Sequence, residues 1–149
     1  MRAIIQRVKH ASVDVNGIKT GTISKGIVTF LGIHRSDDRQ EITWMADKII
    51  NLRIFPDPDG KMNISLADIN AEMLIVSQFT LYGDCRKGRR PGYSGAAPPE
   101  IAEPVYNRFV DEVRNKGIKA ATGRFQAMMD VTLVNDGPVT LLLDSEKKF

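Results

Sequence analysis

The first third of the chain has the residue pattern of three consecutive β-strands. Residues 3–15 are mostly apolar and β-branched, with alternation over the last five positions, and Asn16-Gly17 follows directly. This dipeptide is typical of a two-residue hairpin turn, in which both central residues adopt positive φ. Residues 18–23 predict the returning strand. Residues 27–33 are almost wholly apolar, as in a strand that is buried on both faces of a sheet.

A helix is predicted after this sheet segment. It begins at Ser36-Asp37-Asp38, because Asp38 and Glu41 have the spacing of a capping box. We expect it to end at Arg53 or Phe55, before Pro56. Apolar residues recur at helical spacing at Ile42, Met45, Ala46, Ile49 and Ile50.

A second helix is predicted from Pro98-Pro99-Glu100 to Lys116-Gly117. We expect Pro104 to lie in its first turn or to mark its true start, because proline disrupts a helix interior. The buried face is marked by Val105, Phe109, Val110 and Val113.

Further strands are predicted over residues 63–66, 72–81, 118–122, 129–134 and 139–143. No internal repeat or domain boundary interrupts them. With 42% hydrophobic and 26% charged residues, the chain has enough apolar material for an ordinary core. The sequence therefore predicts a single strand-rich α/β domain over residues 1–149, a curved sheet or barrel with two principal helices.

Several functional classes are excluded by composition. No stretch approaches the roughly 18 apolar residues of a membrane span, and the first residues lack the apolar region of a signal peptide. Cys85 is the one cysteine, which favours a reducing, cytoplasmic setting. His10 and His34 have no ligand partner at metal-site spacing, so we expect no metal site.

The net charge of +3 has one source in the sequence. Of the 21 basic residues, Arg86, Lys87, Arg89 and Arg90 lie within five positions, and the remaining 17 face 18 acidic ones. This loop, residues 82–99, is a candidate phosphate-binding or nucleic-acid-binding segment, with Tyr82 and Tyr93 available to stack on a base. The alternative is a solvated surface loop whose charge only aids solubility.

Two other segments have residues that a purely structural role does not fully explain. Ser77-Gln78-Phe79-Thr80 places hydroxyl and amide groups at the end of a buried strand. Gly137-Pro138 fits a hairpin turn and equally a cis peptide bond, which is almost confined to X-Pro. Cys85 beside Arg86 is interpreted as a tolerated loop thiol rather than a reactive one.

These two segments complete a resemblance. Ser77-Gln78-Phe79-Thr80-Leu81-Tyr82-Gly83-Asp84 and Asn135-Asp136-Gly137-Pro138-Val139-Thr140 resemble the two signature motifs of the D-aminoacyl-tRNA deacylase (DTD) family. Residues 1–8 and Ala97-Pro98-Pro99-Glu100 fit as well, so the resemblance spans the chain. One departure is Gln126, where the family usually has glycine.

The resemblance implies a DTD-like fold and an esterase of translation quality control. Such an enzyme removes D-amino acids, and also mischarged glycine, from the 3′ end of tRNA, without metal or cofactor. It implies a homodimer in which Gly137-Pro138 is cis and enters the partner's site, where its two carbonyl oxygens face the α-amino group of the substrate. Arg7 then supports the orientation of that dipeptide; a surface or dimer salt bridge is the alternative. No membrane or DNA partner is implied.

The resemblance assigns the catalytic positions to Ser77, Gln78, Phe79 and Thr80. Backbone N–H groups around Phe79 and Thr80 are the candidates for oxyanion stabilisation. Thr80 is either a nucleophile or a positioning group, and no general base is evident in the sequence to activate it. The chirality filter is expected to be rigid backbone, because apolar contacts discriminate by only about 10–200-fold per methylene.

Two hypotheses from other classes remain open. One is a non-catalytic RNA-binding module that uses the loop with Arg86 and Arg90. The other is a small-ester or amide hydrolase that uses Thr80 or Ser94, although Gly92-Tyr93-Ser94-Gly95-Ala96 falls one residue short of a nucleophile elbow.

Overall fold

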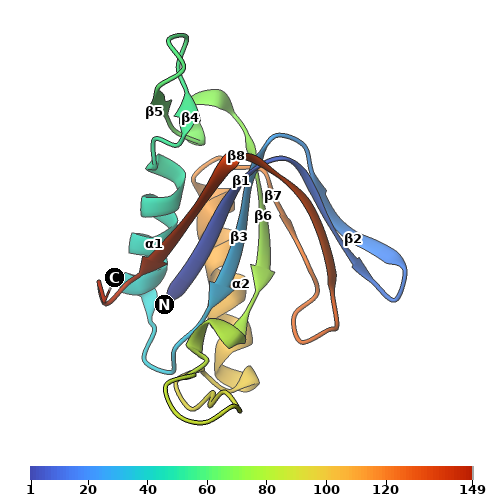
Figure 1. Cartoon of the computed structure of the whole chain (residues 1–149), viewed down its shortest axis with the longest axis vertical. Coiled ribbons are helices and arrows are strands. Elements are labelled where there is room, and N and C mark those ends of the chain that lie inside the picture. The colour runs from blue at the N-terminus through green and yellow to red at the C-terminus, as the bar shows by residue number, and fades with distance from the viewer. Residues whose placement is uncertain (149) are drawn as a thin grey trace.

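One mixed β-sheet carries most of the chain in the computed structural model, which describes residues 1–148 (Figure 1). Phe149, the last residue of the expected domain, lies outside the described residues. The strands are β1 (Arg2–Val15), β2 (Ile18–Ile23), β3 (Gly26–Gly32), β4 (Phe55–Pro56), β5 (Met62–Ile64), β6 (Glu72–Ser77), β7 (Ala120–Thr122) and β8 (Asp130–Asp144). The helices are α1 (Arg39–Asn51) and α2 (Pro99–Asn115), with short 3₁₀ turns η1 (Ala67–Ile69) and η2 (Phe79–Tyr82).

The long strand β1 organises the sheet. It pairs antiparallel with β2, β3 and β8, and the order β2-β1-β3-β6-β7 continues with parallel pairs from β3 onward. At the other edge β2 curls back to β7, where a Cβ on Gly21 would lie 2.4 Å from the carbonyl oxygen of Thr122. Glycine is thus required at this approach, and the sheet is nearly closed. The predicted curved sheet or barrel with two principal helices is confirmed.

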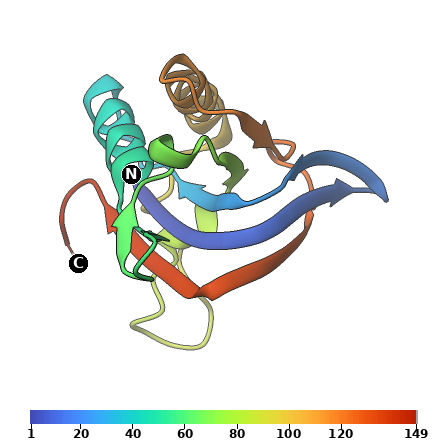
Figure 2. The same cartoon turned by 90° about the horizontal axis from the view of Figure 1, so that it is seen from above.

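The core has two parts because the central strands are buried on both faces. On one face α1 and α2 lie side by side and cover β1, β3 and β6 (Figure 2). Ile27 and Leu31 of β3 point into this part, which includes Met45, Phe109 and Met73. On the other face the curled sheet encloses a smaller apolar cluster, formed by Val8, Ala11, Val13, Val15, Ile23, Val28, Leu74 and Val76. The apolar run of β3 is explained by this double burial.

Both helices form where the sequence predicts, with differences at the boundaries. The capping box of α1 is confirmed: Asp38 accepts from the backbone N–H of Gln40, and Glu41 accepts from that of Asp38. Helix α1 ends at Asn51, earlier than predicted, because Leu52 is already extended. Pro104 lies inside α2 rather than in its first turn or at its start, so that prediction is wrong.

Several predicted strand boundaries are also wrong. The strand expected over residues 63–66 is β5, which ends at Ile64. The strand expected over residues 72–81 ends at Ser77, and the chain turns at Gln78 into η2. The strands expected over 129–134 and 139–143 form one strand, β8, because both halves pair with the continuous β1, with register shifts between them. The strand expected from residue 118 begins at Ala120. Within residues 1–148, no helix combines the length and apolar composition needed to cross a membrane.

Candidate active site

A cavity of about 490 Å³ opens where β6 ends. One wall is Ser77, Gln78 and Phe79, and the opposite wall is the segment of residues 125–131 that joins β7 to β8. The rest is made by Leu31 and Ile33 at the end of β3, Val76 of β6, and Ala97, Pro99 and Ala102 around the start of α2. The cavity is mostly apolar with a few polar side chains, Ser77, Gln78 and Gln126, which is the usual make-up of a small-ligand site.

The turn after β6 presents the predicted motif to solvent. The backbone N–H of Gln78 donates to the carbonyl of Leu31 at 2.8 Å, which ties the strand end to β3. Phe79 and Thr80 are then exposed at the start of η2. The side-chain amide of Gln78 donates to the hydroxyl oxygen of Thr80. An amide is not a proton acceptor of useful basicity, so this contact positions the hydroxyl without activating it.

Arg2 holds the far end of the same motif, a role that no residue pattern in the sequence predicts. Its guanidinium donates to the carbonyl of Leu81 at 3.0 Å and to the carboxylate of Asp144 at 3.1 Å. It also lies 4.6 Å from the ring centroid of Tyr82, a cation–π distance. Burial raises the pKa of Tyr82 well above its usual range, so this phenol stays neutral. Arg2 and Tyr82 therefore have a structural role at the end of η2.

Gln126 occupies an unusual backbone position in the cavity wall. Its φ is +61°, in the left-handed region that favours glycine. This is the position at which the sequence departs from the resemblance to the DTD family. The next exposed residue, Met128, has 89% of its surface accessible, so the wall continues into an apolar rim.

Gly137-Pro138 lies far from this cavity within the same chain. It belongs to the irregular middle of β8, which pairs with β1, so β1 and β3 separate it from β6. Its peptide bond is cis, as the resemblance implies. Gly137 has a φ of +127°, which side-chain-bearing residues rarely adopt. One chain thus keeps the two signature motifs apart.

The side chain of Arg7 packs against the segment that carries Gly137-Pro138. The side chain is buried, and its Nε donates to the carbonyl of Asp136 at 3.1 Å while its Nη1 donates to the carbonyl of Ile54. Its Nε also lies 3.4 Å from the carboxylate of Asp136. The amide of Asn135 spans the same bend, donating at 3.0 Å to the carbonyls of Arg7 and Val139. Arg7 therefore contacts the residue next to Gly137-Pro138 within its own chain.

The loop of residues 82–99, here called the basic loop, lies at the lower end of the molecule (Figure 1). Asp84 pairs with Arg86 at 2.7 Å, and this bidentate contact lowers the pKa of the Asp84 carboxyl well below its usual range. A bridge between Asp84 and Gly92 closes the loop at its base. Lys87, Arg89 and Arg90 are exposed beyond it, available to an anionic partner.

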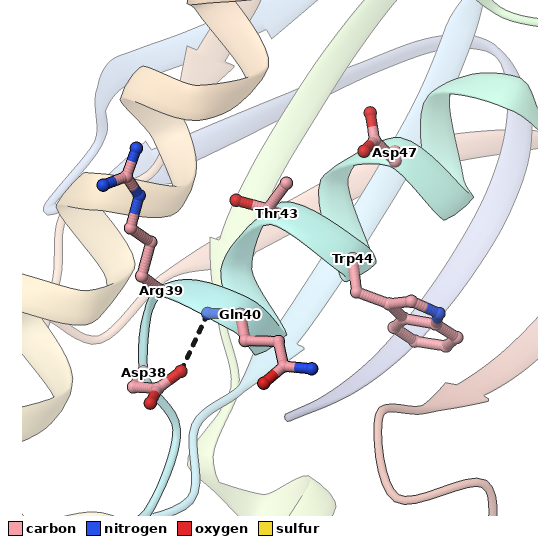
Figure 3. Close-up of a pocket in the computed structure, with 6 residues that line it drawn as sticks. All are labelled: Asp38, Arg39, Gln40, Thr43, Trp44 and Asp47. Atoms are coloured by element: carbon pink, nitrogen blue, oxygen red, sulfur yellow. Dashed lines mark hydrogen bonds between the residues drawn. The ribbon is translucent and has the colours of Figure 1, made fainter.

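The other candidates from the sequence do not join the cavity. Cys85 is exposed in the basic loop, and Ser94 contributes its backbone carbonyl, which accepts from Arg35 at 2.9 Å. Within residues 1–148, no three His, Cys, Asp or Glu side chains gather as metal ligands would. A second depression, on the outer surface of α1, is lined by Asp38, Arg39, Gln40, Thr43, Trp44 and Asp47 (Figure 3). Their side chains splay apart from one helix, so they offer no convergent chemistry.

Comparisons with known proteins identify a family for this chain. The family model described as D-Tyr-tRNA(Tyr) deacylase matches residues 4–144. A D-aminoacyl-tRNA deacylase of Thermosipho africanus is 60% identical over the full length of both chains. Among solved structures, a c-Myc DNA unwinding element binding protein superposes with a TM-score of 0.91 at 42% identity, over 97% of this chain and 98% of its own. A structure described as "a probable eukaryotic D-amino acid tRNA deacylase" shares the fold, with a TM-score of 0.81 at 18% identity, over 95% and 97% of the two chains.

Proposed function

The chain belongs to the D-aminoacyl-tRNA deacylase family and is an enzyme that hydrolyses D-aminoacyl-tRNA; we propose that it selects its substrate with a Gly137-cis-Pro138 element supplied by a second copy of the chain. The observation that carries this proposal is the separation of the two motifs. The cavity lies beside Ser77 and the cis peptide lies across two strands from it. A complete site then needs two chains.

Exposed apolar side chains suited to a second copy lie on β8, on either side of the dipeptide, and at the cavity rim. On β8, Val134 and Leu142 are exposed, at 40% and 57% of their surface, and Met128 projects from the rim of the cavity. Large apolar side chains exposed near functional elements are typical of an interface. In a symmetric dimer each β8 would meet the cavity rim of the partner, so the same contact would be formed twice.

Rigid backbone explains why D-esters would react and L-esters would not. Carbonyl oxygens of the partner's Gly137 and Pro138 would hold the α-ammonium of the substrate. Proline fixes its own φ, and glycine permits close approach because it has no Cβ. The side chain of an L-amino acid would then point into this backbone, whereas that of a D-amino acid would point away. Glycine has no side chain to reject, so glycyl-tRNA would also be hydrolysed.

The chemistry asks little of the protein, because an aminoacyl ester is already activated. Backbone N–H groups of Phe79 and Thr80 would stabilise the oxyanion, a contribution worth on the order of 10²–10³ in rate per donor. Thr80, held by Gln78, would position the ester rather than attack it. The terminal ribose 2′-hydroxyl would help to activate water. We place the enzyme in the cytoplasm, where its substrate is made.

Matched hydrolysis of D-Tyr-tRNA and L-Tyr-tRNA in EDTA tests this proposal. We expect the D-ester to be cleaved faster by more than about 10³-fold, beyond what a methylene-sized apolar contact provides. Activity in EDTA would support a mechanism carried by protein and RNA groups. Equal cleavage of both esters would contradict the filter. Binding of tRNA without cleavage of either ester would favour a non-catalytic RNA-binding module instead.

The basic loop supplies a second test. Replacing Arg86, Lys87, Arg89 and Arg90 by Gln should weaken tRNA binding and lower the slope of log Kd against log salt by about 2–3, because each phosphate contact contributes about 0.7–0.9. Since Arg86 is already paired with Asp84, we expect the change in the salt slope to be smaller than four phosphate contacts would give.

The matched control for this loop removes four exposed cations elsewhere, by replacing Lys9, Lys19, Lys48 and Lys61 with Gln. Duplex DNA serves as a competitor, because a 42% identical protein is named for a DNA element. An unchanged salt slope in the loop variant would remove the loop from the RNA surface. Unchanged cleavage of D-Tyr-tRNA would instead favour a small-ester hydrolase.

A further inference from the structure

We propose that a groove next to the cavity binds the nucleotide that precedes the terminal adenosine of the tRNA. This groove, here called the Tyr93 groove, measures about 360 Å³ and is lined by residues that include Arg35, Phe79, Tyr93, Ala97, Pro98 and Ile101. The proposal rests on the deacylase function above and adds a second RNA contact to it.

The Tyr93 groove contains an exposed aromatic pair. Phe79 and Tyr93 have 58% and 40% of their surface accessible, and their rings meet edge to face at 5.1 Å between centroids. Exposed apolar rings that touch one another form a patch, and such patches mark interaction sites. Bases of single-stranded RNA stack on such rings whatever their sequence, because every base has a π face. The pair therefore favours a base over a charged or purely aliphatic ligand.

The charged side chain that lines the groove is positive, as binding to an RNA phosphate requires. Arg35 lines it, and its guanidinium donates at 2.9 Å to the carbonyl of Ser94, which orients the fork at the rim. The lining contains no carboxylate. Arginine matches phosphate oxygens in both charge and geometry. A cation beside an aromatic pair fits one nucleotide unit, a base with its phosphate.

Continuity with the cavity indicates which nucleotide it is. The groove and the cavity share Phe79 and Ala97, and the groove also includes Tyr93 and Ser94 from the same loop as Arg89 and Arg90. The cavity, at about 490 Å³, has the size that a drug-sized ligand occupies. The cavity accommodates the aminoacylated terminal adenosine. The RNA chain that leads away from this adenosine passes over the groove before it reaches the basic loop.

Truncated substrates test this placement. The D-tyrosyl ester of adenosine lacks the preceding nucleotide, whereas the same ester of cytidylyl-adenosine and D-Tyr-tRNA contain it. We expect Tyr93→Leu to lower kcat/KM roughly 5- to 100-fold on the two longer substrates, the value of one stacked base. On the adenosine ester we expect a change of less than about twofold. Tyr93→Phe should keep wild-type rates on all three, and Arg35→Gln should follow Tyr93→Leu.

Arg39→Gln is the matched charge control, since Arg39 is exposed on α1 outside the groove (Figure 3). It should leave all three rates unchanged. Equal losses for Tyr93→Leu on the adenosine ester and on the longer substrates would overturn the proposal, as would no loss on any of them. A wild-type protein inert toward all three D-esters would instead contradict the deacylase mechanism, so the two failures are distinguishable.

Discussion

Gly137→Ala should reduce kcat/KM for D-Tyr-tRNA by at least about 10²-fold, the effect of displacing a positioning group by about 1 Å. A Cβ at this position would lie 2.7 Å from Nη2 of Arg7 and 3.0 Å from a methyl of Val139. The arginine end is not free to move away, because the carbonyls of Asp136 and Ile54 hold it. The dipeptide must therefore shift, and with it the carbonyl oxygens proposed to hold the substrate.

Backbone strain is separated from close approach by a matched glycine. Gly17 also has positive φ, at +75°, but nothing lies within 4 Å of the position of its Cβ. Gly17→Ala therefore carries the cost of a positive φ, about 1 kcal/mol, without a clash. It should be fully active after correction for stability. Wild-type cleavage by the Gly137→Ala variant would show that close approach is not required.

Arg7→Lys should have the second largest effect. Lysine keeps the charge but replaces a planar fork with a single ammonium group, so it cannot donate to Asp136 and Ile54 in the same geometry. We expect the free energy of unfolding to fall by about 1.5–3 kcal/mol, the value of a hydrogen bond from a charged donor. We also expect kcat/KM for D-Tyr-tRNA to fall by about 10²-fold and the D-to-L rate ratio to narrow.

The D-to-L ratio distinguishes positioning from mere stability. It is measured well below the unfolding transition, where a destabilised but correctly folded enzyme keeps its selectivity. Lys9→Gln on the same strand is the control, since Lys9 is exposed, and it should alter neither stability nor the ratio. A destabilised Arg7→Lys variant with an unchanged D-to-L ratio would confine Arg7 to a structural role.

Local elements of this protein are predictable from the sequence because their causes are local. The hairpin at Asn16-Gly17 depends on the positive φ of two adjacent residues, and both adopt it. The capping box of α1 depends on two residues three positions apart, Asp38 and Glu41. The two signature motifs are likewise contiguous runs of residues, which is why the sequence alone suffices to show the resemblance to the DTD family.

Contacts between distant residues are decided only by the tertiary structure. Pairing along β1 joins the two predicted C-terminal strands into β8 and places Arg7 under Gly137, although 130 positions separate them in the sequence. The tertiary structure also ends β6 at Ser77 and places Arg35 and Tyr93 in one groove. Residue pattern specifies which side of a strand is buried, but not which strand lies beside it or which side chain fills a given space. Those choices depend on how the whole sheet closes.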